Sequence, residues 1–413
     1  MRQRRVQTTE RVIVLVLALA ALIGGFYFAV KSGTNPEAYS NDFNVYYHAA
    51  REVIAGRDPY QQSLGDWVPY LYPPLFAELI TPLALLPLPV AAYLWFLISA
   101  ASIAAAAWMS ASLAFCKQEP YDPEQHDTES SSRRIALAVC ALLLVLRFVL
   151  DTFNLGQVNS VVAGLAVAHL YLYARDRKAW SAVALVLAVS IKLTPALLLI
   201  YHIAKLRLKY AVTCAALLSA ITVVSFLPFG ANGADAFRTF WSRTVENEQG
   251  FELAYSGNQS LRGAMARLIG YPNPDAVEID SKSRYPADLP TLLVSLVFLA
   301  LAVVVAVRAR TSLAGAAPFF CCFALLSPLT WKAHYVILIA PVAHLLAVAK
   351  SSTKARRWIA ATLGVAFVLM NLTGTRVVGL AAAEWADAHS LVFAGALLIF
   401  IASVATSRLP ASR

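Results

Sequence analysis

Charged residues are scarce in this sequence, and its cysteines form none of the spacings that hold metal ions. Only 14% of the 413 residues are charged, which is low for a soluble globular domain. The five cysteines include no Cys-x-x-Cys pair and no Cys/His spacing. Both a structural zinc site and a disulfide framework are therefore disfavoured.

Apolar residues take the place of the missing charge. They make up 59% of the chain, the mean hydropathy is +0.61, and apolar runs near twenty residues long recur throughout. Such runs are typical of membrane-spanning helices. The sequence therefore predicts an all-α polytopic membrane protein. We expect a single membrane-embedded domain over residues 1–413, because the helical bundle is itself the core.

The runs predict about 12 membrane crossings. They lie near residues 12–30, 89–115, 135–150, 157–174, 179–204, 211–228, 290–307, 312–328, 335–349, 358–372 and 390–406. Run 179–204 is interrupted at Lys192–Pro195, so we count it as a hairpin of two short segments. Run 12–30 is longer than the apolar core of a typical signal peptide, and we expect it to remain as the first span.

The basic residues indicate the orientation of the bundle. Most of the 34 lysines and arginines lie in short clusters at one set of alternating connections, which also holds both chain ends. Because such clusters favour the cytoplasmic side, both termini are expected inside. Residues 31–88, 229–289 and 373–389 then form outer loops. The net charge of +10 is explained by membrane topology, so no nucleic-acid partner is expected.

The first outer loop is predicted to contain interfacial helices. Apolar Val45, Tyr46, Ala49, Val53 and Ile54 recur at helical spacing between Asp42 and Ile54, opposite Asn44, His48, Arg51 and Glu52. Gly56 is a suitable stop for that helix. Five prolines interrupt the following stretch, so 75–88 is expected to be a second interfacial or re-entrant segment.

Several polar strings, taken in order, resemble glycosyltransferase family 87, the polyprenol-phosphate-mannose-dependent α-mannosyltransferases of GT-C architecture. The strings are Asp42–Ala50, Gly56–Tyr60, Tyr72–Pro74, Gly156–Asn159, Ile191–Pro195, Asn258–Leu261 and Leu326–His334. The resemblance extends over residues 12–350. Two departures stand out: Ala333-His334 replaces a pair of histidines, and the first loop has no Asp-x-Asp, so a metal has no support.

The resemblance implies a multi-pass enzyme of the plasma membrane, in a bacterium the inner membrane, with its active site on the outer face. The donor would be a hexose, mannose in the family, linked through one phosphate to a polyprenol. The acceptor would be a lipid or glycan, and no cofactor would be needed. Displacement at the anomeric carbon with inversion requires a base for the acceptor hydroxyl and groups that stabilise the departing phosphate.

Asp42 is the candidate base. An Asp at the start of a helix more commonly caps backbone N–H groups, and the two roles can coexist. Asp58, before Pro59, is instead expected to form a turn. His334 is predicted at the outer end of a span, where it would pair with Asp42 or touch the acceptor. The alternative is a structural histidine with no contact to substrate.

The remaining candidates would bind substrate. Lys192 lies about 20 Å along its run, so its charge must face a cavity, a partner or the outer interface. It would contact phosphate or pack beside Asp151, unless it snorkels. Arg57 and Arg262 are further phosphate candidates, the latter beside Asn258 and Gln259. Gln157 and Asn159 would bond sugar or cap a helix. The aromatic rings that would stack on sugar, or belong to an interfacial belt, are Tyr46, Tyr47, Tyr72 and Trp331.

Two other functions fit a chain of this class. A flippase or secondary transporter for lipid-linked sugars would place charges and broken helices near the midplane in pseudo-symmetric pairs. Here only Lys192 has such a position, and the other polar motifs gather at the outer ends. A ligase that moves a whole lipid-linked glycan would differ only in its acceptor cavity. The asymmetry favours an enzyme.

Overall fold

The computed structural model describes residues 2–34, 41–60, 63–64, 68–115, 128–242, 255–269, 287–351 and 353–406. Much of the predicted outer loop 229–289 and the basic residues near the C-terminus lie outside these ranges. Within them the chain is helical, apart from one hairpin of two-residue strands in which Ser63 pairs with Pro69. This confirms the predicted all-α class.

The elements follow the order of the chain. The first half contains α1 (Arg2–Thr34), α2 (Asp42–Ile54), β1 (Ser63–Leu64), β2 (Val68–Pro69), α3 (Pro74–Ala84), α4 (Leu88–Ala114), α5 (Thr128–Leu144), α6 (Leu146–Leu155), α7 (Asn159–Ala174), α8 (Lys178–Ile191), η3 (Thr194–Ala196) and α9 (Leu197–Ala204). The second half contains α10 (Leu208–Phe226), η4 (Leu227–Asn232), α11 (Gly233–Phe240), α12 (Leu261–Ile269), α13 (Asp288–Arg308), α14 (Ser312–Leu325), η7 (Lys332–Leu338), α15 (Ile339–Ser351), α16 (Thr353–Asn371), α17 (Thr375–Val378), α18 (Leu380–Ala388) and α19 (Leu391–Thr406).

Four helical stretches in the described residues are long and apolar enough to cross a membrane. They are Leu88–Ala114, Leu208–Gly230, Asp288–Arg308 and Lys332–Ser351. The number rises to six if two bent pairs each count as one span: Ser131–Leu144 with Leu146–Leu155, bent by 70°, and Leu380–Ala388 with Leu391–Thr406, bent by 53°. These helices are those of a multi-pass membrane protein. The number of about 12 crossings stays a prediction.

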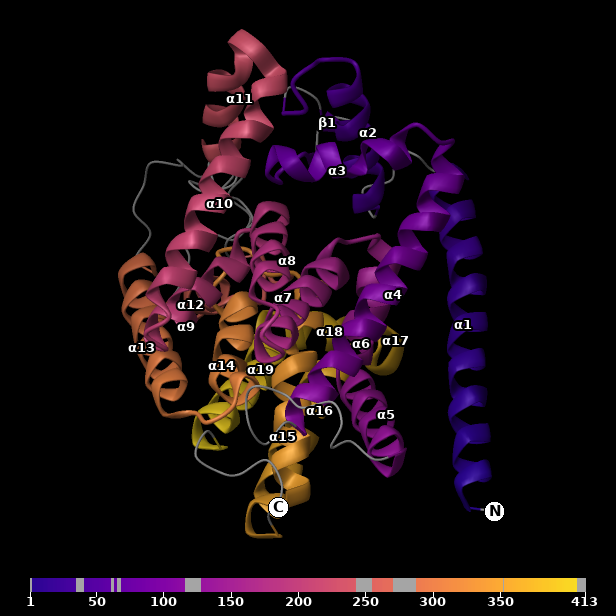
Figure 1. Ribbon diagram of the computed structural model, residues 1–413, viewed down its shortest axis with the longest axis vertical. Helices are drawn as coiled ribbons and strands as arrows, with labels where there is room; N and C mark the ends of the chain where they lie inside the picture. Colours follow the sequence, from indigo (N-terminus) through magenta and orange to yellow (C-terminus); the bar gives the residue numbers. More distant parts are fainter. Residues whose placement is uncertain are drawn as a thin grey trace.

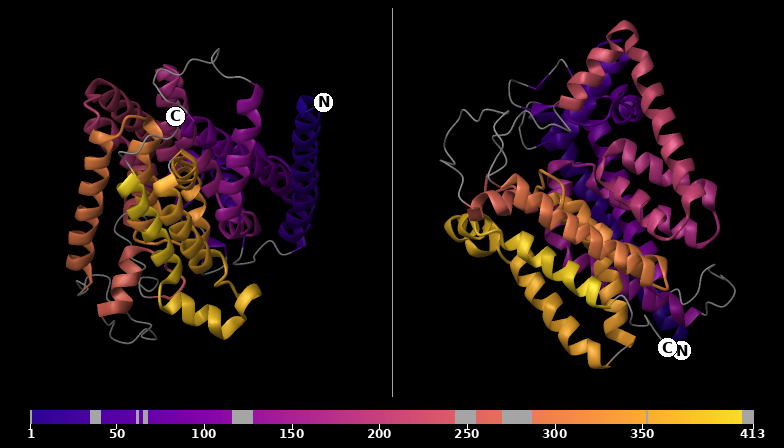
Figure 2. Two further views of the ribbon diagram at one scale, coloured as in Figure 1. Left: turned by 90° about the horizontal axis from the view of Figure 1, so that it is seen from below. Right: turned by 90° about the vertical axis from the view of Figure 1, so that its left-hand side faces the viewer.

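The helices form a bundle with a buried centre and an apolar outside. Every residue of α14 is buried, whereas α10 and α13 expose many large apolar side chains, as helices facing lipid do. Figure 1 shows α2, α3 and α11 at one end of the molecule and the start of α1 at the other. The end of α19 points to the same end as the start of α1 (Figure 2). We call the end that carries α2 and α3 the loop end.

Helix α2 matches the predicted helix 42–54, and Gly56 follows it with φ of +68°. Its faces differ from the prediction: Asn44 and Glu52 are buried, while Ile54 is exposed. The pattern failed because α2 packs against both α3 and α4, so protein covers positions that an interfacial helix would show to water. The next segment forms α3, an 11-residue helix that contains Pro82.

Candidate functional site

Asp42 is the first residue of α2 but does not cap it. The N-cap is Asn41, which makes no side-chain capping bond; its amide nitrogen donates instead to Ser32 Oγ at 2.6 Å. The Asp42 carboxylate faces Gln157, Lys192 and Lys31. The helix start therefore serves to direct this partly exposed carboxylate toward α7 and the turn that follows α8.

A line of polar side chains connects Lys192 to Asp42. Lys192 Nζ donates to Asn159 Oδ1 at 2.9 Å, and Asn159 Nδ2 donates to Gln157 Oε1. The Gln157 side chain in turn faces the Asp42 carboxylate and favours its charged form. Each amide thus accepts on the Lys192 side and donates on the Asp42 side. The result is a directed line with a cation at one end and an anion at the other.

The local fold of Gly156 sets the start of this line. Gly156 ends α6 with φ of +65°, a conformation that favours glycine. A Cβ there would lie 2.5 Å from Phe28 Cζ and 2.9 Å from Phe43 Cβ. Trp95 Nε1 donates to the Gly156 carbonyl at 2.8 Å. The close packing fixes Gln157 and Asn159, which are both buried at the start of α7.

Lys192 lies at the tip of the predicted hairpin. Helix α8 ends at Ile191, and Lys192 is extended, with φ of −148° and ψ of 131°, because Pro195 has no N–H to continue the helix. The chain then returns through η3 and α9. His202 at the end of α9 lies 2.9 Å from His169, between their Nε2 atoms, and His169 contacts Ser181 near the start of α8. The two arms therefore end at one level, which confirms the hairpin.

Partial burial makes Asp42 an unusually basic carboxylate. Loss of water around it raises its pKa to about 6, against the opposing effects of the Gln157 hydrogen bond and the charges of Lys192 and Lys31. At neutral pH the group is still mostly ionised. It can therefore accept a proton, and it binds that proton more strongly than an exposed aspartate does.

His334 and Lys192 line the same cavity. It holds about 310 Å³ of empty space, counting the part open to solvent, and its other lining residues include Asn159, Thr194 and Ser327. The backbone N–H of Trp331 donates to His334 Nδ1 at 2.9 Å. The neutral ring therefore carries its proton on Nε2, which makes it a hydrogen-bond donor. His334 makes no hydrogen bond to Asp42.

Tyr72 belongs to the same region through Tyr46. The Tyr46 hydroxyl donates to the Tyr72 hydroxyl at 2.9 Å. Burial is the main cause that raises the pKa of both phenols, and the charge of Asp42 raises it further. The structure thus brings together Asp42, Gln157, Asn159, Lys192, His334 and Tyr72. Tyr46 was expected only as a ring that stacks on sugar, whereas the structure shows its hydroxyl bonded to Tyr72. Its spacing of four from Asp42 places both residues on one helix face.

Both candidate arginines already have carboxylate partners. Arg57 Nη2 bonds Glu52 Oε1 at 2.9 Å, and Arg262 Nη2 bonds Asp288 Oδ1 at 2.8 Å. Asp58 accepts from the Tyr60 N–H at 2.9 Å, which confirms the predicted turn. Trp331 is partly exposed and meets Tyr255 edge-on, with the ring centroids 5.9 Å apart.

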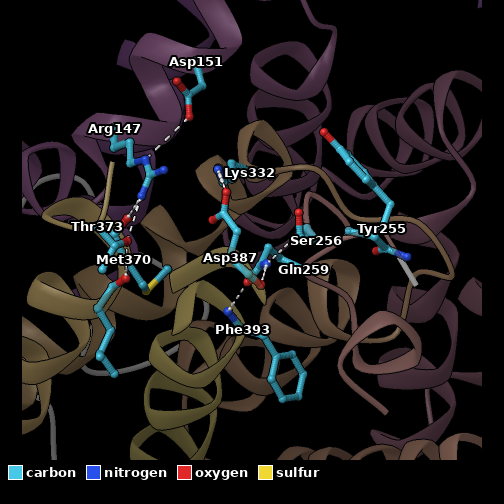
Figure 3. A network of polar contacts seen from close by, with 12 residues as sticks. Arg147, Asp151, Tyr255, Ser256, Gln259, Lys332, Met370, Thr373, Asp387 and Phe393 are labelled. Carbon is cyan, nitrogen blue, oxygen red and sulfur yellow. Dashed lines mark hydrogen bonds and ion pairs between the residues drawn. The ribbon is translucent and has the colours of Figure 1, made fainter. Parts of the chain in front are cut away.

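Asn258 and Gln259 are buried in a network that joins the loops. Asn258 Oδ1 accepts from the Thr330 N–H at 3.0 Å, and Gln259 Nε2 donates to the Asp387 carbonyl at 2.9 Å. Figure 3 shows Asp387 also paired with Lys332, at 2.5 Å. These bonds connect the segment before α12 with η7 and α18.

Asp151 is paired within its own helix. Its partner is Arg147, whose Nε lies 4.0 Å from Asp151 Oδ2 (Figure 3). The hydrogen bond of Lys192 instead goes to Asn159. Across the described ranges, no three His, Cys, Asp or Glu side chains gather closely enough to hold a metal ion.

Comparisons with known proteins agree on one family. The family described as Glycosyltransferase family 87 matches residues 70–330. A polyprenol-phosphate-mannose-dependent α-(1-2)-phosphatidylinositol pentamannoside mannosyltransferase of Mycolicibacterium smegmatis is 28% identical over 380 residues, which cover 88% of this chain and 83% of that protein. The Mycobacterium tuberculosis protein of the same name is 26% identical over 342 residues, covering 81% and 71%.

A third relative carries a slightly different name. It is a polyprenol-phosphate-mannose-dependent α-(1-2)-phosphatidylinositol mannoside mannosyltransferase of Mycobacterium tuberculosis, 26% identical over 359 residues, which cover 81% of this chain and 76% of that protein. The family match includes Tyr72, Gln157, Asn159 and Lys192 and begins after Asp42.

Proposed function

Since the chain belongs to glycosyltransferase family 87, we propose that it transfers mannose from a polyprenyl phosphate to an acceptor lipid or glycan on the outer face of the plasma membrane. The names of the relatives support mannose as the sugar and a phosphatidylinositol mannoside as the acceptor. The basic clusters at the connections opposite the loop end support the outward orientation, within a bundle of about 12 crossings.

The directed line from Lys192 to Asp42 is the observation that carries this proposal. Transfer with inversion needs a base on one side of the sugar and a cation on the other. Asp42 takes the proton of the acceptor hydroxyl as its oxygen attacks the anomeric carbon. The bond from that carbon to the phosphate oxygen breaks, and its electron pair leaves with the polyprenyl phosphate. Lys192 stabilises the negative charge that remains on the phosphate.

The other residues of the site bind the substrate and orient the reacting groups. Gln157 and Asn159 hold the two charges at a fixed separation, because both are buried and bonded to each other. His334 donates from Nε2 into the cavity that it shares with Lys192, where a phosphate oxygen or a sugar hydroxyl would accept. No cofactor and no metal take part in this scheme, since a phosphate monoester leaves without an acid.

Replacement of Asp42 by Asn tests the proposal. The amide is nearly isosteric but cannot accept the proton, so transfer of radiolabelled mannose from polyprenyl-phosphate-mannose should fall by at least about 100-fold. Membranes that contain the variant at normal abundance, supplied with a phosphatidylinositol mannoside, provide the measurement. A transporter or flippase would move the lipid-linked sugar equally well with either side chain.

Asp58→Asn is the matched control. It lies in the same loop, and its Oδ1 atom accepts a turn bond from the Tyr60 N–H, which an Asn oxygen also does. This variant should keep near-normal transfer. Retained transfer in Asp42→Asn, with the chain folded and abundant, would remove Asp42 as the base.

A further inference from the structure

The hydroxyl groups of Tyr46 and Tyr72 form a hydrogen-bonded pair with a fixed direction. Tyr46 donates to Tyr72 at 2.9 Å. Burial raises the pKa of the Tyr46 hydroxyl, while the backbone of Val158, just before α7, acts to lower that pKa, as a nearby N–H does. The Tyr46 oxygen thus faces a donor, and its own proton goes to Tyr72. The Tyr72 oxygen accepts, so its proton remains to be donated.

The surroundings hold both rings in place. Tyr46 is fully buried, and its ring meets Phe76 edge-on with the centroids 4.8 Å apart and Tyr72 at 5.0 Å. Tyr72 is held further by its carbonyl, which accepts from the Tyr60 hydroxyl at 2.7 Å. Its ring also packs on Phe76 at 5.4 Å. Protein therefore occupies much of the ring surface of Tyr72, and its hydroxyl is the group that can contact a substrate.

The Tyr72 proton has no acceptor among the described residues. Tyr46 is the hydrogen-bond partner of that hydroxyl, and it donates. Tyr72 is partly exposed, and the charged group that acts on it most strongly is Asp42. A hydrogen-bond donor, Tyr72, and a proton acceptor, Asp42, thus lie near each other, while Lys192 and His334 line a cavity whose lining includes neither of them.

We propose that Tyr72 donates a hydrogen bond to the acceptor sugar, at the hydroxyl next to the one that Asp42 deprotonates, and that Tyr46 is a positioning residue for this bond. The chemistry recognised is a vicinal diol: one hydroxyl gives its proton to the carboxylate, while its neighbour accepts a hydrogen bond from the phenol, which keeps its proton. The acceptor side is assigned because in-line displacement puts the base and the leaving phosphate on opposite faces of the sugar. The inference rests on the proposed function.

The test compares Tyr72→Phe, Tyr46→Phe and the double variant, with polyprenyl-phosphate-mannose as donor and a phosphatidylinositol mannoside as acceptor. Both replacements keep the rings. Each single variant should raise the KM for the acceptor about tenfold, the usual effect of one lost hydrogen bond, and leave the KM for the donor within about twofold. The double variant should be no worse than Tyr72→Phe, because Tyr46 acts only through Tyr72.

A modified acceptor sharpens the test. Removal of the hydroxyl next to the nucleophile should weaken the acceptor about tenfold for the wild type and should make no further difference to Tyr72→Phe. Tyr70→Phe is the matched control, because it removes a hydroxyl that donates to the Pro73 carbonyl at 3.0 Å within the same aromatic group. Its acceptor KM should stay unchanged.

The outcomes separate the two proposals. A wild type that transfers no mannose from this donor overturns the proposed function, together with the inference. Normal wild-type transfer with an unaltered acceptor KM in Tyr72→Phe overturns the inference alone. So does a change confined to the donor KM, or an additive effect in the double variant, which would give Tyr46 a purely structural role.

Discussion

The carboxylate of Asp42 is surrounded by groups that act on it in opposite directions. Burial favours the protonated form, while Gln157, Lys192 and Lys31 favour the charged form. The balance leaves the pKa at about 6, near enough to neutral pH for an effective base. Small electrostatic changes nearby should therefore be measurable in the rate of transfer.

The rate of mannose transfer should depend on pH through Asp42. Because the folded pKa is raised to about 6, the base is ionised above that value and protonated below it. The rate should be level near pH 7 and fall about tenfold per pH unit below pH 6. Lys31→Met removes a positive charge that favours the ionised form, so its acid limb should move to higher pH. Rates of mannose transfer between pH 4.5 and 8 provide the measurement.

Lys31 suits this purpose because it lies outside the cavity. Its ammonium donates to the Asn154 carbonyl at 2.7 Å, so its replacement leaves the line from Lys192 to Asp42 in place. An acid limb that is unchanged in Lys31→Met, or one that moves to lower pH, would contradict the assignment of that limb to Asp42.

Sequence patterns identified individual site residues unequally well. Asp42, Gln157, Asn159 and Lys192 lie in strings that resemble a known family, and they converge in the structure. The partners of Arg57 and Arg262 were not predictable, since neither Glu52 nor Asp288 belongs to a motif. A sequence shows which side chains can bind phosphate, but it does not show which of them a nearby carboxylate has already paired.

Among the elements, the turn from α6 to α7 positions the site most directly. Gly156 has a left-handed backbone and no room for a side chain, and two residues of the polar line follow it at once. Gly56, after α2, has the same backbone sign with nothing within 4 Å of an added Cβ. A substitution at Gly56 therefore introduces backbone strain alone, whereas one at Gly156 introduces both backbone strain and steric overlap.

This contrast gives a prediction about stability. Gly56→Ala should cost only the strain of a left-handed alanine, about 1 kcal/mol. Gly156→Ala adds overlap with Phe28 and Phe43, so it should lower the thermal unfolding midpoint of the detergent-solubilised protein clearly further. It should also lose transfer activity, because Gln157 must move. Equal midpoints for the two variants would show that the turn adjusts without resistance.

Helix breaks were predictable where glycine or proline marks them. The stop at Gly56 and the hairpin tip before Pro195 are two such cases. The 70° bend between α5 and α6 has no such mark, because Val145 and its neighbours continue an apolar run. The helices α17 and α18 within the predicted loop 373–389 were not predicted from the sequence either, since they are held by packing of α17 on α18 and of α18 on α19.

For the molecule as a whole, orientation is the property on which the proposed chemistry depends. The loop end carries Asp42, and the α13–α14 and α15–α16 connections, which hold two of the basic clusters, lie toward the other end (Figure 1). His48 is an exposed residue of α2, and Lys178 is exposed at the start of α8, with 60% of its side chain accessible. The proposed orientation puts these two positions on opposite sides of the membrane.

Thiol labelling of intact cells tests that arrangement. His48→Cys should react with a membrane-impermeant maleimide added outside, beyond the background of the parent protein. Lys178→Cys should react only after the membrane is permeabilised. The reverse pattern would place Asp42 in the cytosol and overturn the proposed reaction.

The number of crossings was harder to predict than their existence. Hydropathy locates apolar helices, yet several of them, such as α7, α8 and α14, have 14 to 16 residues. Residues this few do not span a 30 Å hydrocarbon layer on their own. An apolar composition shows that a helix avoids water. A helix buried inside the bundle and a helix that faces lipid have the same apolar composition, so hydropathy does not distinguish them.

The amide line also bears on chemical ageing. Deamidation of Gln157 or Asn159 would exchange a nitrogen donor for an anionic oxygen, which removes the donor of one contact in the line and adds a second negative charge near the base. Such a molecule would keep its helices and its size. A stored preparation is therefore best judged by mass spectrometry of these two side chains, since light scattering or circular dichroism would report it as intact.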